Sequence, residues 1–526
     1  PKTYGALTSI DALRDIWLLN HGAKLAERLI LKAALIPVGE RVLPCHAGGC
    51  AGRGCAEQAF ALHAAIEEAH AAFTPLYVLW VDLIKCFMSF SRRAGRVALM
   101  HLGVPTFVVD ALQALCEDAK GQCVSGRFET AFGSSDEFAL LRGFLQGAHA
   151  SPEQCKVMMN TLAEALELKT VGYVFFAPDG AGADVVQLVF VDDAAGLTQS
   201  VGMMQRVALF WSLWCAVTDS QANIHALKKT VLSGVEFRRN KLGEMVPVTT
   251  DAEVYMVGLC AGDAPRRVPV MCIRVCYKYV GFWTCLSRNH LRTAVPEIRK
   301  KFKAACASAV DGGPSLRLAR SDAAAGVLGN ACYYGAIYGG TVAQVEEWWG
   351  PAARQVASSG KLGRQKRARS APRLLLHAPE RPMDVRERAN DDMAQAVVNA
   401  AGPAAAITGL GLPHPYPPMM ASTVATFMAC LASPYDTPGA RAAQCGLARV
   451  AWECGCRVNP CRFDFRAWMG ILDQTVTLER GLWMVLSLHG GRLMLDEHFP
   501  PRSALHSSRW PGYPDGWRPL WRGQLR

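Results

Sequence analysis

The stretch Gln187-Leu-Val-Phe-Val-Asp-Asp-Ala-Ala-Gly-Leu-Thr198 joins two short apolar runs through a pair of adjacent aspartates. Apolar residues on both sides of a short acidic turn predict a β-hairpin with Asp192 and Asp193 at its tip. Neighbouring carboxylates repel each other unless a cation or a basic side chain neutralises them. Hard divalent cations such as Mg²⁺ prefer oxygen ligands of this kind, so the pair is a candidate metal site. An ordinary solvated turn is the alternative interpretation.

A third carboxylate follows another apolar run earlier in the chain. The segment Tyr77-Val-Leu-Trp-Val81 has the composition of a buried strand, and it ends at Asp82. Functional sites in layered folds are usually built where strands end. An aspartate after a strand is also a common turn former, so Asp82 by itself leaves both interpretations open.

Between these two segments lies Gly143-Phe-Leu-Gln-Gly-Ala-His-Ala-Ser-Pro-Glu153. Ser151 followed by Pro152 is a favourable N-cap and first-turn pair, and apolar residues at helical spacing follow it. We therefore predict that a buried helix starts here with Ser151 as its N-cap. Capping does not account for Gln146 and Gly147, which we expect to form a polar turn facing the site.

The composition describes a folded protein with several structural units. A chain of 526 residues is too long for one core, and 51% hydrophobic with 19% charged residues excludes a disordered chain. The net charge of +11 favours a polyanionic partner, either nucleic acid or an anionic membrane surface. The 19 scattered cysteines and the lack of a secretory signal predict a reduced intracellular compartment, nucleus or cytoplasm. The apolar runs are too short for a membrane span, and a first residue Pro1 instead of Met is expected of a piece of a longer chain.

Taken in order, the three segments resemble the palm of reverse transcriptases, in particular those of non-LTR (LINE-type) retrotransposons. The segment from Asp82 to Phe87 is similar to the first carboxylate motif of that family. Gln146-Gly147 followed by Ser151-Pro152 matches its Gln-Gly-x-x-x-Ser-Pro motif, and Phe190 to Asp193 matches its aromatic-x-Asp-Asp box. Weaker similarity extends over about residues 10 to 355.

The weaker matches concern segments that contact the nucleotide and the primer in that family. Arg14 and Lys24 resemble fingers residues that approach the triphosphate, and Lys229 resembles a lysine near the leaving pyrophosphate. Tyr277-Lys-Tyr-Val-Gly281 resembles the primer-grip hairpin. Three features depart from the family pattern. Met88 stands where a second aspartate is frequent, and Val191 stands where LINE-type enzymes favour Ala. Residues 235–269 form a longer spacer.

The resemblance implies an α+β fold of the right-hand polymerase type. We expect fingers in residues 1–75, and a palm with the remaining fingers and the primer-grip hairpin in residues 76–290. The palm sheet would be antiparallel and carry the Asp pair. A helical thumb in residues 291–355, a basic linker in 356–375 and a mostly helical C-terminal region of unknown role in 376–526 would complete the chain.

The activity implied by the resemblance is RNA-directed DNA polymerisation. Asp82, Asp192 and Asp193 would hold two Mg²⁺ ions, or Mn²⁺, while a dNTP reacts with a primer 3′-hydroxyl. The partners would be an RNA template, a DNA primer, their hybrid and dNTPs. Phe87 would exclude the ribose 2′-hydroxyl, or it is a plain core residue. The remaining candidate residues divide into a nucleotide-binding set, Arg14, Lys24, Gln146, Gly147 and Lys229, and a primer-grip set, Tyr277, Tyr279 and Gly281.

Several alternatives remain open at this point. A degenerate or maturase-like protein would hold RNA without polymerising, and an RNA-dependent RNA polymerase shares the palm and the paired aspartates. The basic run from Lys361 to Arg373 is a solvated linker, a localisation signal or an RNA contact. Two groups have loose zinc-ligand spacing without paired Cys-x-x-Cys knuckles: Cys45, His46, Cys50 and Cys55, and Cys454, Cys456 and Cys461 with His489 or His498.

Overall fold

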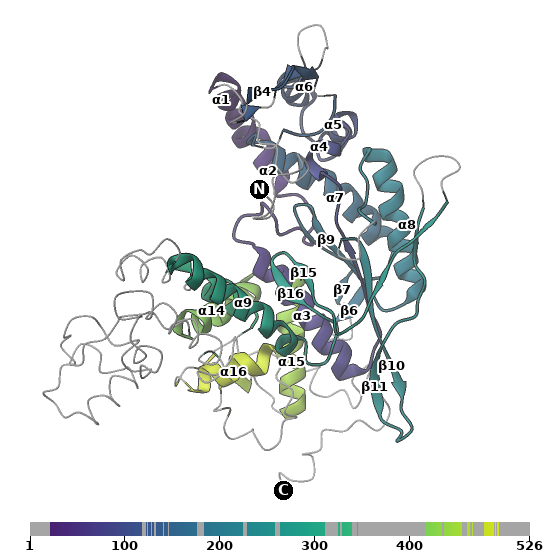
Figure 1. Cartoon of the computed structure of the whole chain (residues 1–526), viewed down its shortest axis with the longest axis vertical. Coiled ribbons are helices and arrows are strands. Elements are labelled where there is room, and N and C mark those ends of the chain that lie inside the picture. Colours follow the sequence, from purple (N-terminus) through teal and green to yellow (C-terminus); the bar gives the residue numbers. More distant parts are fainter. Residues whose placement is uncertain are drawn as a thin grey trace, which may run out of the picture.

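The computed structural model describes residues 21–117, 123, 125–127, 129–130, 133–139, 141–145, 147–175, 183–224, 229–257, 264–310, 325–326, 329–338, 345, 416–433, 436–454, 460–462, 465, 478–488, 490 and 492–493. These residues form a mixed α and β structure (Figure 1). Within these ranges, no helix is both long and apolar enough to cross a membrane.

The centre of the molecule is a six-stranded sheet. Its strand order is β11-β10-β1-β9-β8, and β14 pairs with β10 outside this path. The pairings along the main path are antiparallel, whereas β14 runs parallel to β10. The strands are β1 (Leu76–Val81), β8 (Gln187–Phe190), β9 (Asp193–Thr198), β10 (Val231–Arg239), β11 (Met245–Thr249) and β14 (Val270–Met271).

Strand β1 is the central strand because its side chains are apolar on both faces. Tyr77, Leu79 and Val81 join one hydrophobic core, and Leu76, Val78 and Trp80 join the other. All six residues are buried. A strand covered on both faces reads as a continuous apolar run, which is why this segment lacks an alternating pattern.

Helices cover the face of the sheet to which Tyr77 and Leu79 point (Figure 1). The two long helices α7 and α8 pack on this face, and Trp211 of α8 is fully buried in the core. Shorter helices pack around α7. The helices on this side are α1 (His21–Ile30), η2 (Leu31–Leu35), α2 (Ile36–Gly39), α4 (Cys86–Ser89), α5 (Arg92–His101), α6 (Thr106–Ala114), α7 (Ser151–Lys169) and α8 (Val201–Thr218).

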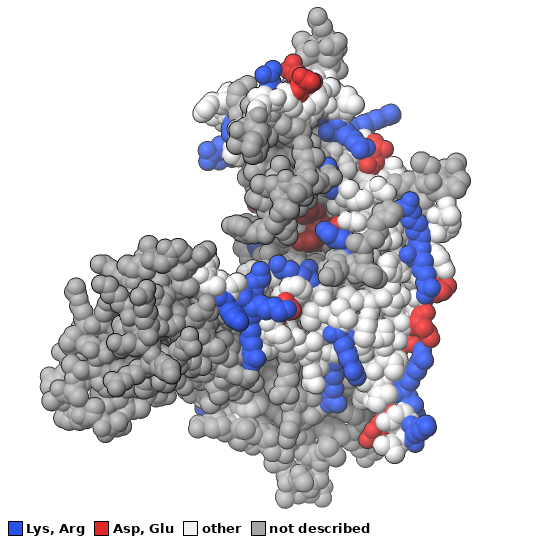
Figure 2. All heavy atoms as spheres, in the orientation of Figure 1, with Lys and Arg blue, Asp and Glu red and all other residues white. Residues whose placement is uncertain are grey.

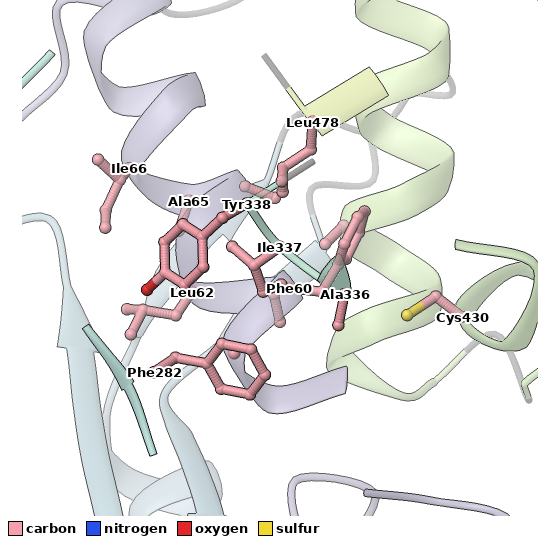
Figure 3. Packing of buried hydrophobic residues seen from close by; sticks show 14 of the residues in the cluster. Phe60, Leu62, Ala65, Ile66, Phe282, Ala336, Ile337, Tyr338, Cys430 and Leu478 are labelled. Carbon is pink, nitrogen blue, oxygen red and sulfur yellow. The ribbon is translucent and has the colours of Figure 1, made fainter. Parts of the chain in front are cut away.

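The opposite face is covered by elements from both ends of the described chain. Helix α3 lies against the sheet and contacts α14 and α15 from the C-terminal region. Phe60, Phe282 and Tyr338 come together in this core from three distant segments (Figure 3). The elements are α3 (Cys55–Ala72), the hairpin β15 (Tyr277–Tyr279) and β16 (Phe282–Thr284), α9 (His290–Val310), α14 (Tyr416–Ala432), α15 (Pro438–Cys454), η6 (Pro460–Arg462) and α16 (Leu478–Leu488).

A buried polar network connects the same elements. The Glu67 carboxylate of α3 accepts the backbone N–H of Leu478 at 3.0 Å, at the start of α16. Arg449 of α15 pairs with Glu479 at 3.1 Å and lies 3.9 Å from Glu67. Burial holds the pKa of His290, which lies 3.6 Å from Glu67, well below its usual range. Arg449 therefore supplies the positive charge that both buried carboxylates share inside the core.

Four two-stranded sheets complete the described structure. Their pairings are β2 with β5, β3 with β4, β6 with β7, and β12 with β13. The strands are β2 (Ser125–Gly126), β3 (Glu129–Thr130), β4 (Gly133–Ser134), β5 (Phe138–Ala139), β6 (Tyr173–Phe175), β7 (Ala183–Val185), β12 (Tyr255–Met256) and β13 (Arg266–Arg267). The long spacer of residues 235–269 therefore extends β10 and supplies β11, β12 and β13.

One local prediction is wrong. Helix α7 begins at Ser151 itself, so Ser151 is not the N-cap. Its hydroxyl donates to the carbonyl of Leu145 at 2.8 Å. Glu27 of α1 accepts instead from the backbone N–H groups of His149 (2.8 Å) and Ala150 (3.1 Å) just before the helix. A remote carboxylate thus holds the chain just before the helix, and the sequence around Ser151 carries no sign of it.

Candidate active site

The predicted acidic hairpin forms, but its tip lies one residue earlier than predicted, because Asp193 belongs to β9. Phe190 pairs with Asp193, so Val191 and Asp192 make a two-residue turn between β8 and β9. Val191 has φ +59°, a left-handed conformation that is unfavourable for a β-branched residue. The segment around Gly48 approaches this turn so closely that a Cβ at position 48 would lie 2.5 Å from the Val191 nitrogen. Strained backbone of this kind persists only where the surrounding structure holds it, and it is frequent at functional sites.

The sheet register brings Asp82 next to Asp193. Val81 of β1 pairs with Ala194 of β9, so the next position along β1, Asp82, faces Asp193 across the two antiparallel strands. Side chains alternate along a strand, so Asp82 lies on the same face as Trp80, and Asp193 on the same face as Ala195. Trp80 and Ala195 both belong to the core that contains β15 and β16. The two carboxylates are therefore at one end of the sheet, on the side of that hairpin.

Asp82 is held in place by three residues that follow α8 in the chain, Asn223, Lys229 and Thr230. The Asn223 side-chain amide donates to Asp82 Oδ2, and Lys229 Nζ lies on Asp82 Oδ1, both at 3.2 Å. The hydroxyl of Thr230 contacts both the backbone N–H and the carbonyl of Asp82 at 3.2 Å. Lys229 stays about half exposed and thus forms a partly solvated ion pair.

The electrostatics show that all three aspartates lie within interaction range. Desolvation, together with the negative charges of Asp192 and Asp82, raises the pKa of Asp193 to about 6. Lys229 and Lys278 act in the opposite direction on the same pKa. The site therefore carries more negative charge than its two lysines neutralise, which favours a bound cation.

The hairpin β15–β16 lies against this cluster (Figure 1). The Tyr277 ring stacks on Trp80 with centroids 4.5 Å apart, and its hydroxyl donates to the Lys229 carbonyl at 2.8 Å. The hydroxyl of Tyr279 donates to the carbonyl of Leu188 in β8 at 3.0 Å. Desolvation, with the charges of Asp82 and Asp193, raises the pKa of Tyr277. Tyr277 and Tyr279 thus attach the hairpin to β1, which ends just before Asp82, and to β8, which ends just before the acidic turn.

The tip of that hairpin requires glycine at its second turn position. Val280 and Gly281 have φ values of +41° and +91°. The Tyr333 hydroxyl donates to the Val280 carbonyl, and the Tyr333 ring stacks on Phe282 with centroids 4.5 Å apart. Gly281 is therefore explained by turn geometry and by the close approach of Tyr333.

Phe87 lies in α4, half-buried at the edge of the core around α7. Its carbonyl accepts the N–H of Phe144 at 2.6 Å. A Cβ at Gly143 (φ +87°) would lie 2.6 Å from the backbone of Met88. Met88, which replaces the aspartate of the family pattern, packs on the small core of Leu145 and Ala148. The segment after Asp82 is thus joined directly to the loop that leads into Gly147.

The remaining nucleotide-binding candidates belong to the N-terminal helix and this loop. Gly147 is exposed with φ +100°, a conformation that favours glycine. Lys24 lies in α1 three residues before Glu27, whose carboxylate binds the end of the same loop. Positions three apart lie on one side of a helix, so Lys24 is on the side of α1 that approaches this loop. Arg14 and Gln146 lie outside the described residues.

The first cysteine group has a structural explanation. His46 forms a parallel bridge with Val189, and Val189 exchanges backbone hydrogen bonds of 3.0 Å with Cys45 and Ala47. Burial lowers the pKa of His46 to about 3 and raises that of Cys45. The segment therefore extends the sheet beside β8, next to the acidic turn. In the second group, Cys456, His489 and His498 lie outside the described residues.

Among the residues that the structure describes, no three His, Cys, Asp or Glu side chains are arranged as a preformed metal site. This also applies to the aspartates, where Lys229 contacts Asp82 directly. Magnesium at phosphoryl-transfer sites commonly binds only one or two carboxylates together with substrate phosphates and water. The all-oxygen donor set and the raised pKa of Asp193 fit such a site, which substrate would complete.

Three residues at the site are not among the sequence-predicted site residues. Asn223 and Thr230 hold Asp82, and Lys278 acts on the pKa of Asp193. Lys278 lies between two predicted primer-grip tyrosines, so its position was a usable signal. Asn223 and Thr230 border a segment similar to the family's lysine motif, but nothing in their own residue types indicates that they contact an aspartate 141 and 148 positions away.

Comparison with known proteins gives no match to a family model and none to a curated protein. Among solved structures, the chain is similar to telomerase from Candida tropicalis in complex with a TWJ fragment of telomeric RNA, with 12% identity and a TM-score of 0.28 over 60% of this chain and 45% of the telomerase. For telomerase from Candida albicans with the same RNA fragment, the values are 11% and 0.28 over 72% and 55%. The chain spans about half the length of these telomerases. Likenesses this distant carry no argument about fold or function. The proposed function rests on the geometry of the site.

Proposed function

We propose that this chain is a template-directed polymerase of the reverse-transcriptase type, which extends a DNA primer on an RNA template from dNTPs. The observation that carries the proposal is the convergence of three separate sequence segments at one end of an antiparallel sheet. Asp82 faces Asp193, Asp192 occupies the adjacent strained turn, and the aromatic hairpin β15–β16 lies against both strands.

Asp82, Asp192 and Asp193 would hold divalent cations, with Mg²⁺ as the expected ion and Mn²⁺ as an alternative. Bound there, such ions would lower the pKa of a primer 3′-hydroxyl and offset the charge of a triphosphate. The chain's own contribution is positioning. Asn223 and Thr230 fix the backbone and one carboxylate oxygen of Asp82, so this ligand does not need to reorganise when substrate arrives.

The role of Lys229 would change when a nucleotide binds. Its ammonium group lies 3.2 Å from Asp82 Oδ1 and remains half exposed, so it can move to a phosphate oxygen without breaking buried contacts. A lysine that transfers from a carboxylate to a triphosphate would neutralise charge on the leaving pyrophosphate. Tyr277 attaches the Lys229 backbone to the primer-side hairpin through its hydroxyl.

The hairpin β15–β16 would position the primer terminus. Lys278 lies close enough to Asp193 to affect its pKa, and its ammonium group is 5.9 Å from the centre of the Trp283 ring. A cation and an indole ring beside the carboxylates suit a sugar–phosphate backbone with its terminal base. The finer assignment to a non-LTR retroelement rests on the sequence motifs around Asp82, Gly147 and Asp192.

The test is extension of a labelled DNA primer on an RNA template with Mg²⁺ by the purified chain. Parallel reactions would supply dNTPs or NTPs, and a DNA template of the same sequence. Extension with dNTPs on RNA supports the proposal, and extension with NTPs alone would instead identify an RNA polymerase. Tight RNA binding without extension under any of these conditions would favour the degenerate or maturase-like alternative.

A further inference from the structure

Two cysteines flank the hairpin β15–β16 at its base. The register of the hairpin pairs Tyr279 with Phe282 and Tyr277 with Thr284. One position further, Cys276 and Cys285 stand opposite each other. Cys276 is partly exposed and Cys285 is buried, and both are free thiols.

The turn geometry determines what kind of pair this is. Val280 and Gly281 form a two-residue turn, so the flanking pair Tyr279–Phe282 is hydrogen-bonded, and hydrogen-bonded and non-hydrogen-bonded pairs alternate from there. The Cys276–Cys285 pair is therefore non-hydrogen-bonded. Cα atoms in such pairs are about 4.5 Å apart. This lies within the roughly 4.4–6.8 Å range that a disulfide spans.

The side chains of this pair share one face of the hairpin with Lys278 and Trp283. The Lys278 ammonium group lies 5.9 Å from the Trp283 ring centre, which shows that side chains of opposite strands meet on this face. The two thiols also meet. Interaction between the two thiols lowers the pKa of Cys285 and raises the pKa of Cys276, so the two sulfurs lie within interaction range.

We infer that Cys276 and Cys285 form a reversible dithiol–disulfide site at the base of the hairpin, oxidised by hydrogen peroxide. The assignment rests on the register, on the contact between the two thiols and on the partial exposure of Cys276. Ser287 supports it, because its hydroxyl lies 3.1 Å from the Cys285 sulfur and can donate to a thiolate there.

The reaction balances with one peroxide per pair. The Cys285 thiolate attacks one peroxide oxygen, the O–O bond breaks, and hydroxide leaves and becomes water by taking up the proton that Cys285 had released. The Cys285 sulfenic acid is then attacked by the Cys276 sulfur, and the displaced hydroxide leaves as a second water with the Cys276 proton. Two thiols lose two electrons and two protons in total. A thiol reductant reverses the step.

Two other cysteine arrangements compete with this assignment. Cys272 is exposed and lies near enough to Cys285 for their charges to interact. No strand register aligns it with Cys285. The sulfurs of Cys86 and Cys155 are 4.0 Å apart, but both residues are buried in the core around α7, so this pair has no partly exposed member such as Cys276.

The disulfide would act on the site through the hairpin. Tyr277 and Lys278 follow Cys276 directly, and they contact the Lys229 backbone and influence Asp193. A crosslink at the hairpin base restricts how Tyr277 and Lys278 adjust when a primer binds. This effect on synthesis, unlike the crosslink itself, rests on the proposed polymerase function.

The crosslink can be detected directly because trypsin separates the relevant cysteines. Cleavage after Arg267, Arg274, Lys278 and Arg288 places Cys272, Cys276 and Cys285 in three different peptides. The reduced full chain would be treated with hydrogen peroxide, alkylated, digested without reductant and analysed by mass spectrometry. We expect peptide 275–278 linked to peptide 279–288, and loss of this species on reduction with dithiothreitol.

Two variants complete the design. Cys276→Ser should abolish the linked species and leave Cys285 as a sulfenic acid that dimedone traps, whereas the matched control Cys272→Ser should keep the link. Recovery of Cys285 linked to Cys272, or of both cysteines alkylated as in untreated protein, would overturn the assignment. The wild-type measurement decides this even if a variant fails to fold.

Primer extension by the same samples separates the two proposals. If the chain is a polymerase, peroxide should change its extension rate, dithiothreitol should restore the rate, and Cys276→Ser should not respond. A linked peptide in a protein that extends no primer would reject the proposed function and leave the disulfide site standing. Primer extension without a linked peptide would support the proposed function and reject the disulfide site.

Discussion

At the scale of single residues, Asp193 shows that negative charge is unfavourable at this site. Its pKa is about 6 in the folded chain against an ordinary value of 3.8. A raised pKa means that the stability from this group is fully present below about pH 4 and is lost as pH rises through about 6. The folded chain therefore accepts a cost at neutral pH that a bound cation would relieve.

Asp193→Asn should remove this cost. Because Asp193 keeps solvent contact, we expect the variant to gain only about 1 kcal/mol relative to wild type between about pH 4 and pH 7. Urea unfolding at both pH values measures the difference. Magnesium at pH 7 should stabilise the wild type more than the variant. Parallel stability profiles, with no response to magnesium, would show that Asp193 does not carry the excess charge.

Phe87 is the second residue whose role can be separated from packing. Replacing the ring by the smaller side chain in Phe87→Val would relieve a clash with a ribose 2′-hydroxyl and leave its carbonyl bond to Phe144 in place. We expect incorporation of ribonucleotides to rise at least about tenfold, roughly 1.4 kcal/mol, while use of dNTPs stays near wild type. Single-nucleotide extension with matched dNTP and NTP checks this. An unchanged preference would make Phe87 a core residue.

At the scale of elements, the sequence predicts strands and hairpins that depend on neighbouring residues, and it misses contacts between segments that are distant in the chain. The strand before Asp82 and the hairpin around Asp192 were predictable because each is an apolar run that ends at a carboxylate. The extra strand pairing of His46 with Val189 was not, because a Gly- and Cys-rich segment has no strand pattern and its partner is distant in sequence. The contact of Glu27 with the start of α7 was not predictable for the same reason.

Helix α9 combines a buried and a basic side. Ala294, Ile298 and Phe302 are buried at intervals of four residues, and Lys301 and Lys303 are exposed. Figure 2 shows Lys and Arg side chains gathered over the region where Figure 1 places α9 and the hairpin β15–β16. This distribution matches an element that binds a polyanion with one side and the core with the other.

Reversing charge on α9 tests that interpretation. In Lys301→Glu with Lys303→Glu, affinity for an RNA–DNA duplex should fall, and the slope of log affinity against log salt should become shallower by somewhat under one unit for each lost phosphate contact. Lys241→Glu, an exposed residue in the turn between β10 and β11, is the control. Equal slopes for all three proteins would reject a duplex contact by α9.

At the scale of the whole molecule, the C-terminal helices and the central sheet share one core. Phe60 of α3 packs edge-to-face on Phe427 of α14 with ring centroids 5.5 Å apart, and Arg441 of α15 donates to the Asp184 carbonyl at 2.6 Å. No role for residues 376–526 was predictable from the sequence, because we recognised no motif in this range. Their described part covers the side of α3 that faces away from the sheet (Figure 3).

The buried network around Arg449 should be essential to that core. Arg449→Met leaves Glu479 and Glu67 without their cation, and we expect a loss of about 3–5 kcal/mol in the free energy of unfolding. Arg449→Met combined with Glu479→Leu removes the cation and one of its two carboxylates, so it should recover part of this loss, while Glu67 keeps its bond to the Leu478 N–H. Thermal and denaturant unfolding would measure both proteins. If the single variant is as stable as wild type, the ion pairs of Arg449 contribute little to the stability of this core.

The most direct measurement for the whole account is primer extension by Asp192→Asn and Asp82→Asn. The amide keeps the size of each side chain but removes a charge, so the sheet and its hairpin should fold as before. We expect magnesium-dependent extension on an RNA template to fall about 10³-fold or more in each variant, several kcal/mol in activation free energy. Asp251→Asn, at an exposed aspartate beyond β11, should extend like wild type. Extension at the wild-type rate by a folded Asp192→Asn protein would contradict the central claim that these carboxylates form the catalytic site.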